Sequence, residues 1–136
     1  MALSFHPKPG MVLMCDFSKG FRPPEIVKVR PVVVISPRPR RRTQLCTVIP
    51  LSSTAPSPVE PHHHKLDPAS LPQALAGTET WAKCDLIMTV CLDRLDRVKG
   101  RDPKTGQRLY TTSEVTAADF DAIQGAVVAA LGLPKI

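Results

Sequence analysis

The run Val29–Ser36 constrains the fold more than any other stretch of this chain. Most of its residues are Val or Ile, whose stiff χ1 angles favour a β-strand. Pro31 has no N–H to donate to a ladder, so it belongs at the first residue of that strand or on an edge. Arg30 is therefore predicted to lie where a loop enters a β-sheet, which is a common position for a functional side chain.

Further strands are predicted around this one. They cover the apolar runs 11–17 and 45–51, an edge strand over 59–66 that Pro61 interrupts, a mixed polar and apolar strand over 81–90, and a short strand or turn over 92–98. The segments between them, 18–25, 52–58, 67–79 and 100–106, are rich in turn-forming or polar residues and are predicted to be loops.

One helix is predicted, at the C-terminal end. Thr116 is an N-cap candidate, and Asp119 would lie near the positive end of the helix dipole. Apolar residues recur at helical spacing, and Gly132 followed by Pro134 ends the pattern; the apolar face comprises Phe120, Ile123, Val127 and Leu131. The fold class is therefore mainly β with a C-terminal helix, a small barrel or curled sheet. Residues 1–9 are predicted to be an N-terminal arm, and residues 10–136 a single domain.

The formal net charge of +6 indicates an anionic partner, such as nucleic acid, an acidic peptide or a membrane surface. Part of the excess lies in the turn Arg38–Arg42, which is either a solvated loop or a phosphate-contacting patch. No apolar run reaches the ~20 residues of a membrane span, and the N-terminus lacks an apolar signal segment. We therefore expect a cytoplasmic protein whose four separated cysteines are reduced thiols.

The three consecutive histidines His62, His63 and His64 are the obvious candidates for metal ligands. Adjacent strand residues point to opposite faces, so at most His62 and His64 would share one face. Two ligands do not make a site, and no further ligand stands at a suitable spacing. The sequence therefore predicts no metal and no cofactor.

A set of polar residues lies at or near the ends of three predicted strands: Glu25, Arg30, Ser52, Ser53, Lys83 and Asp85. Cleaving RNA without a metal needs a proton acceptor, donors that hold the negative charge on phosphorus, and an acid for the leaving oxygen. Arginine suits the second role because its planar fork binds phosphate through two hydrogen bonds. Taken singly, however, these residues are equally consistent with solvated charges, turn residues and a cross-strand pair.

Several ordered motifs resemble the MazF/PemK-like toxins of bacterial type II toxin–antitoxin systems. The segment 10–17 resembles the family's opening strand, and Lys19-Gly20 resembles the end of the family's first loop. Glu25 followed by 30–36 resembles a Glu followed by Arg-Pro-[AV]-[LV]-Val-[LI]-Ser. Residues 48–53 resemble the family's Val-[IV]-Pro-[IL]-[ST]-[ST]. Cys84-Asp85 together with Thr89 resembles the motif of a later strand in the family. The resemblance covers about residues 10–131.

This resemblance implies an SH3-like β-barrel that works as a homodimer. It implies a metal-independent, sequence-selective endoribonuclease that cuts single-stranded mRNA and leaves 2′,3′-cyclic phosphate and 5′-OH ends. It assigns catalysis to Arg30, Ser52 and Glu25, and it places Glu25 in a first loop that borders the RNA groove and moves on binding. The residues expected to contact RNA are Ser53, Lys83, Asp85, Lys19, Lys28 and Arg40. The implied partners are a cognate antitoxin, whose acidic tail occupies the RNA groove, and operator DNA through that antitoxin.

The chain departs from the family pattern at four positions. Met11 replaces an Asp, Lys28 stands where a Gly is frequent, and Leu86 and Met88 replace polar residues. Two other classes of function therefore stay open at the level of sequence. One is a toxin on the same fold that acts by protein binding, as gyrase poisons do, and the other is a basic RNA-binding barrel without turnover.

Overall fold

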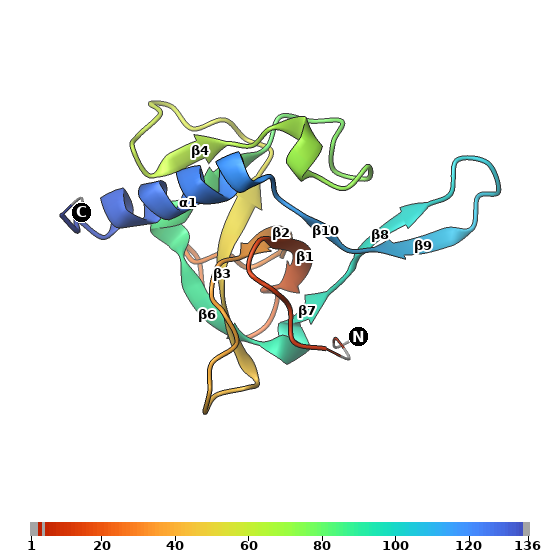
Figure 1. The fold of residues 1–136 in the computed structure, drawn as a ribbon, viewed down its shortest axis with the longest axis horizontal. Helices are drawn as coiled ribbons and strands as arrows, with labels where there is room; N and C mark the ends of the chain where they lie inside the picture. Colours follow the sequence, from red (N-terminus) through yellow and green to blue (C-terminus); the bar gives the residue numbers. More distant parts are fainter. Residues whose placement is uncertain (1–2, 4, 135–136) are drawn as a thin grey trace.

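A curled antiparallel sheet with one C-terminal helix forms the body of the protein (Figure 1). The computed structural model describes residues 3 and 5–134. In that part of the chain, the main path of the sheet runs β10-β1-β2-β3-β5-β4, with β6 on β3 and β7 on β1. The strands are β1 (Met11–Asp16), β2 (Val29–Val34), β3 (Leu45–Ser52), β4 (His63–Lys65), β5 (Trp81–Lys83), β6 (Met88–Cys91), β7 (Leu95–Asp96) and β10 (Ser113–Glu114). A separate two-stranded sheet pairs β8 (Val98–Arg101) with β9 (Arg108–Thr111).

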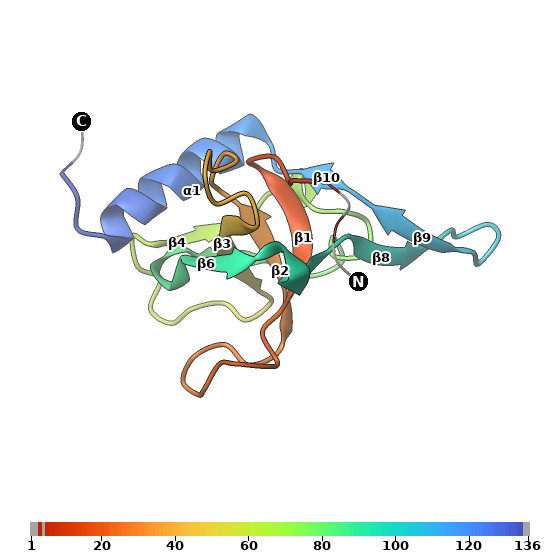
Figure 2. The same ribbon diagram turned by 90° about the horizontal axis from the view of Figure 1, so that it is seen from below.

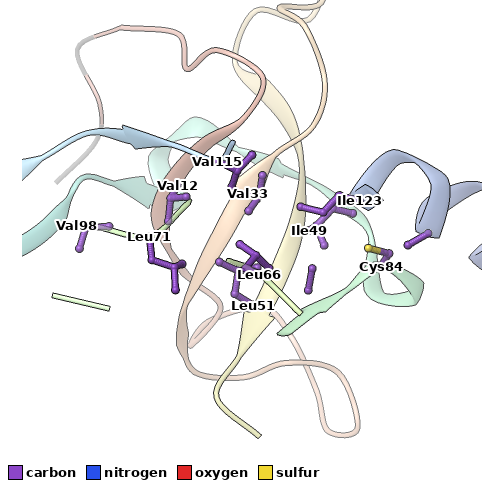
Figure 3. Close-up of a cluster of buried hydrophobic side chains, with 12 residues drawn as sticks. Val12, Val33, Ile49, Leu51, Leu66, Leu71, Cys84, Val98, Val115 and Ile123 are labelled. Atoms are coloured by element: carbon purple, nitrogen blue, oxygen red, sulfur yellow. The ribbon is translucent and has the colours of Figure 1, made fainter. Parts of the chain in front are cut away.

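The central strands are buried on both faces, which explains why their sequences are continuous apolar runs. On one face, Val33 of β2 packs with Val12 and Ile49 in a cluster that also meets the helix (Figure 3). On the other face, Val32 and Val34 pack with Leu13, Phe17 and their neighbours. The predicted Val29–Ser36 strand is therefore the centre of the fold, and the predicted mainly β class is confirmed.

Helix α1 (Ala117–Ala130) covers the first cluster with Ile123 and Ala126. The Thr116 side chain accepts a hydrogen bond from the Asp119 amide, so the predicted N-cap is confirmed. At the other end, Gly132 adopts a φ of 68°. The amides of Gly132 and Leu133 donate to the carbonyls of Ala129 and Val128, which is a Schellman motif. Leu131, predicted on the apolar face, is instead 56% exposed because it lies at the C-cap.

Asp119 does more than complement the helix dipole. Its carboxylate is almost fully buried and accepts hydrogen bonds from the Ser70 hydroxyl, the Asp67 amide (2.9 Å) and His64 Nε2 (2.8 Å). Burial by itself would raise the pKa of this carboxyl, but the hydrogen bonds from Ser70 and His64 outweigh it and lower the pKa. This network fastens β4 and the 3₁₀ turn η1 (Pro68–Ser70) to the start of α1.

The predicted strand over 81–90 is wrong as a single element. It is broken into β5 and β6 by the 3₁₀ turn η2 (Cys84–Leu86), because β5 pairs with the end of β3 and β6 with its start. A second 3₁₀ turn, η3 (Leu92–Arg94), precedes β7. Strands β9 and β10 were not predicted, since they lie in a polar stretch without an apolar run.

Three of the four cysteines, Cys15, Cys46 and Cys84, are buried, and none of the four forms a disulfide. The segment predicted as a loose N-terminal arm contacts the body, since the His6 ring lies 3.3 Å from the Leu45 carbonyl and Pro7 is buried. No helix in the described ranges is long and apolar enough to cross a membrane.

Candidate active site

The open end of the β2–β3 hairpin brings Arg30 and Ser52 together. Val32 pairs with Pro50 and Val33 with Ile49, and the same register continued to the strand ends places Arg30 across from Ser52. Both residues line one pocket of about 220 Å³. The other lining residues are Pro31, Leu51, Ser53, Leu75, Thr78 and Thr80. Two residues separated by about twenty positions are thus brought together by strand register alone.

The Arg30 side chain is available to an external anion. It is half-buried, and among the described residues it has no hydrogen-bond or ion-pair partner. A guanidinium held at a strand end, with its donors unused, can bind two oxygens of a phosphate at once. The base of its side chain is fixed by the β1–β2 ladder, in which Arg30 pairs with Cys15.

The hydroxyl of Ser52 is oriented by its own loop. Its Oγ accepts a hydrogen bond from the Thr54 amide at 3.1 Å, and its backbone pairs with Trp81 of β5. Accepting this bond leaves the hydroxyl proton free to be donated to a substrate oxygen. Ser53, the neighbouring residue, is exposed and lines the same pocket.

The wall of the pocket opposite the hairpin comes from residues 75–80, which the sequence predicted only as a loop. Leu75, Thr78 and Thr80 lie there, and the Thr80 carbonyl accepts the amide proton of Leu66. No pattern in this stretch indicated a contribution to the site, because tertiary contacts position the long connection.

Glu25 does not line this pocket. It is exposed in the β1–β2 connection, where its carboxylate accepts a hydrogen bond from the Arg22 amide at 2.9 Å. Lys19 and Lys28 are exposed on the same connection. Glu25 thus stabilises its own turn in this conformation, and the first loop must rearrange before its carboxylate can reach a ligand at Arg30.

Arg94, which the sequence did not single out, holds the start of this first loop. Its Nη1 donates to the Asp16 carbonyl (3.0 Å) and the Lys19 carbonyl (2.8 Å), and its guanidinium lies 4.6 Å from the centre of the Phe21 ring. No local signal marks this arginine, because its partners are backbone carbonyls more than seventy residues away in the sequence.

Lys83 and Asp85 lie beside the histidines on β4. Lys83 pairs with His63 across β4 and β5, and Asp85 Oδ2 lies 3.7 Å from His62 Nε2. Lys83 ends β5, the strand next to β3, and Asp85 lies in η2. Neither residue lines the Arg30–Ser52 pocket. Leu86, one of the departures from the family pattern, is exposed on η2, and Met88 packs into the second cluster.

The predicted grouping of the histidines is wrong. His62 lies in a turn before β4, so strand alternation does not apply to it, and its ring contacts that of His63. His64 points the other way, to Asp119. His62, His63 and Asp85 bring ligand atoms within 4.8 Å of one another, so a third potential ligand does exist. The Glu60 amide donates to His63 Nδ1, which places the proton of the neutral ring on Nε2 and disfavours metal binding there.

Arg40 is not brought to the site. It is exposed in the turn that joins the closed end of the β2–β3 hairpin, whereas Arg30 and Ser52 lie at the open end. The four residue steps from Arg30 to Val34 span roughly 13 Å of strand. Arg40 can therefore meet only a ligand that extends well beyond the pocket.

The chain is similar to known proteins along most of its length. Residues 8–127 match the model of the family described as PemK-like, MazF-like toxin of type II toxin-antitoxin system. The uncharacterised protein YifN of Escherichia coli K12 is 30% identical over 118 residues, which are 73% of this chain and 78% of YifN.

Solved structures show the same fold. An endoribonuclease from a mycobacterial species superimposes with a TM-score of 0.64 at 26% identity and covers 97% of both chains. A mycobacterial endoribonuclease in complex with its cognate antitoxin gives 0.63 at 26% identity, over 96% of this chain and 99% of the other. MazF from Deinococcus radiodurans, 20% identical, covers 96% of this chain and 100% of its own with a TM-score of 0.63, and so supports the fold. The chain belongs to the PemK-like, MazF-like toxin family of type II toxin–antitoxin systems.

Proposed function

We propose that this protein is an endoribonuclease toxin and that Arg30 and Ser52 carry its chemistry. The observation that supports this most directly is the convergence of the two residues in one pocket, with the Arg30 guanidinium unpartnered among the described residues. Relatives with the same fold at 26% identity are endoribonucleases. A basic chain with a net charge of +6 suits an RNA substrate.

The reaction needs no group beyond those of the chain. The 2′-oxygen attacks phosphorus while the bond to the 5′-oxygen breaks, leaving a 2′,3′-cyclic phosphate and a 5′-OH. Arg30 stabilises the charge that grows on the non-bridging oxygens, and the Ser52 hydroxyl donates a hydrogen bond to one of them. Glu25 accepts the 2′-OH proton once the first loop has rearranged and later releases it to the solvent, and the solvent protonates the 5′-oxygen as the P–O bond breaks.

The other residues predicted to contact RNA are assigned to nucleotides at the edge of the pocket or beyond it. Ser53 lies at its edge, and Lys19, Lys28, Lys83, Asp85 and Arg40 are assigned to more distant nucleotides of a single-stranded mRNA read with sequence preference. We propose a cytoplasmic homodimer whose activity is blocked by a cognate antitoxin, since one mycobacterial relative is a complex with its antitoxin. Binding to operator DNA would then occur through that antitoxin.

The test is cleavage of a long, unstructured RNA in excess EDTA, with wild type, Arg30→Ala and Arg42→Ala compared side by side. Arg42 is the matched control because it lies in the turn at the closed end of the hairpin, away from the pocket. Discrete cuts with 5′-OH ends are expected from wild type and Arg42→Ala, and none from Arg30→Ala. Intact RNA in spite of tight, salt-sensitive binding would replace this proposal by a binding module. Neither cutting nor binding would direct attention to a protein target such as gyrase.

A further inference from the structure

The β8–β9 hairpin stands apart from the rest of the fold. We call residues 97–111 the basic arm. In the described part of the chain its two strands pair only with each other, and both views show it projecting away from the sheet and the helix (Figures 1 and 2). Every residue of β9 is exposed. Each four-residue strand spans about 13 Å, so the basic arm reaches well beyond the body.

The register of the hairpin sorts its side chains by charge. Lys99 pairs with Tyr110 and Arg101 with Arg108, so these four side chains share one face. Arg97, two residues before Lys99, belongs to the same face, and its guanidinium lies 4.9 Å from the centre of the Tyr110 ring. The opposite face carries Val98, Gly100, Leu109 and Thr111. Val98 is buried in the first cluster, and a Cβ on Gly100 would lie 3.7 Å from Ala74. The β8 half of the apolar face thus meets the body, whereas its β9 half and the basic face are exposed.

This distribution of charge is unfavourable for the isolated arm. Arg101 and Arg108 are directly opposite each other, and like charges in that position destabilise a hairpin. The arm has five basic residues and one acidic residue, Asp102, whose carboxylate accepts the amide proton of Lys104 in the turn. Among the described residues, Lys99, Arg101 and Arg108 have no ion-pair partner. An anionic ligand would remove the repulsion.

The base of the basic arm adjoins the candidate active site. Arg97, Val98 and Lys99 line a pocket of about 430 Å³ together with Val29 and Leu75. Leu75 also lines the pocket of Arg30 and Ser52, and Val29 immediately precedes Arg30. The larger pocket is also lined by Asp16, Asp93 and Asp96, whose carboxylates repel phosphate. A strand of RNA with its reacting phosphate at Arg30 would therefore reach the basic face of the arm along Leu75, the residue that the two pockets share.

We propose that the basic arm binds RNA phosphates that flank the cleaved bond, with the half-exposed Tyr110 ring stacking on a base; this rests on the proposed ribonuclease function. Guanidinium groups alternating with an aromatic ring match a chain of phosphates and bases. A second copy of the arm carries the same charge and is repelled. An acidic peptide would satisfy the arginines but offers no base to Tyr110.

The experiment measures RNA binding against salt in an Arg30→Ala background, where the RNA stays intact. The variant Arg101→Ser/Arg108→Ser is compared with the control Lys8→Ser/Lys65→Ser, which removes the same charge from two exposed positions outside the arm and the pocket. For single strands, the plot of log K against log [salt] becomes shallower by about 0.7 for each phosphate contact that is removed. The arm variant should therefore reduce the magnitude of this slope by roughly 1.4. The control should leave it unchanged. With an oligonucleotide of about 4 nucleotides, too short to reach the arm, the two variants should bind equally.

Three results would overturn the proposal. Equal salt slopes for the two variants on a long RNA would show that the arm does not contact phosphate. If the arm variant changed only the affinity for poly-glutamate, the partner would be an acidic peptide. If it changed the sedimentation coefficient, the arm would be an interface between copies of this chain. If the Arg30→Ala parent itself failed to bind RNA, the proposed function would fail first, which keeps the two failures distinguishable. Far-ultraviolet circular dichroism and melting of each variant check the fold.

Discussion

At the scale of single residues, the candidate chemistry depends on two side chains that the structure holds in different ways. Arg30 is unpaired among the described residues and anchored through the β1–β2 ladder, whereas the Ser52 hydroxyl is oriented by the Thr54 amide. A hydroxyl that already accepts one bond is oriented to donate its proton in a defined direction. Ser52 should therefore affect the rate of cleavage more than the affinity for RNA.

Replacing Ser52 by Ala should slow single-turnover cleavage on the order of 10²-fold, which is the usual effect of removing one donor to a developing oxyanion. Ser52→Thr retains a hydroxyl and should recover most of the rate, and Ser57→Ala, in the exposed turn after β3, should behave as wild type. The rate is measured with enzyme in excess over a labelled RNA. A Ser52→Ala variant that cleaves at the wild-type rate would remove this hydroxyl from the mechanism.

At the scale of elements, the start of α1 is held by a buried carboxylate instead of by apolar packing alone. Asp119 joins Ser70, Asp67 and His64, so β4 and η1 cannot leave the helix without exposing or orphaning polar groups. Breaking a buried network of this kind costs about 1–3 kcal/mol for each unsatisfied group. The network also makes the stability depend on pH.

Asp119→Asn should reduce the free energy of unfolding at pH 7 by about 2 kcal/mol, while Asp121→Asn, exposed on the same helix, should have little effect. Because the pKa of Asp119 is lowered by folding, its stabilisation is complete above the unfolded pKa of about 3.9 and is lost as the pH falls through the folded pKa. Urea unfolding between pH 6 and roughly pH 3 should therefore show that the difference in free energy of unfolding between wild type and Asp119→Asn becomes smaller as the pH falls. A difference that stays constant or widens would contradict this account.

Two glycines, one inside α1 and one just past its C-terminal end, give a second pair of element-scale variants. Gly132→Ala forces a Cβ into a φ of 68° and should destabilise the protein by about 1 kcal/mol. Gly125→Ala lies within the helix, where an added Cβ meets nothing within 4 Å, and should stabilise it by about 0.5–1 kcal/mol. Denaturation midpoints measure both changes, and effects of the same sign would show that the helix end is not the Schellman cap described above.

At the scale of the whole molecule, one curled sheet separates two apolar clusters. Cys84 is buried in the first cluster, and Cys15 and Cys46 are buried in the second. Burial raises the pKa of Cys15 to about 12, of Cys46 to about 11 and of Cys84 to about 12. A thiol that is both buried and protonated reacts slowly, since the thiolate is the nucleophile. Access to these three sulfurs therefore requires opening of the core.

Alkylation of the native protein with iodoacetamide at pH 8 should modify the half-buried Cys91 first, and the other three only at the rate of unfolding. Mass spectrometry over time should show one early addition followed by three that appear together in dilute urea. Cys91→Ser is the control and should abolish the early addition alone. Early modification of Cys15 or Cys84 would mean that the core opens locally.

The sequence by itself determined the strands whose signals are local: 11–16, 29–34 and 45–52 are apolar runs, and α1 has a cap, a periodic face and a terminating glycine. It also placed Arg30 and Ser52 at predicted strand ends, but their catalytic roles came from the resemblance to the family and stay a prediction. These features follow from propensity and periodicity, which act over a few residues. The ordered motifs then led to the family.

Only the tertiary structure decided the rest. Register across β2 and β3 placed Arg30 opposite Ser52, and long-range contacts brought Leu75, Arg94 and Asp119 to their partners. The break between β5 and β6 arises because two segments pair with opposite ends of one strand. The basic face of the arm depends on hairpin register, in which a shift by one residue would turn each arginine to the other side. Pairings between distant residues leave no signal in either partner's neighbourhood, and so the sequence alone could not predict them.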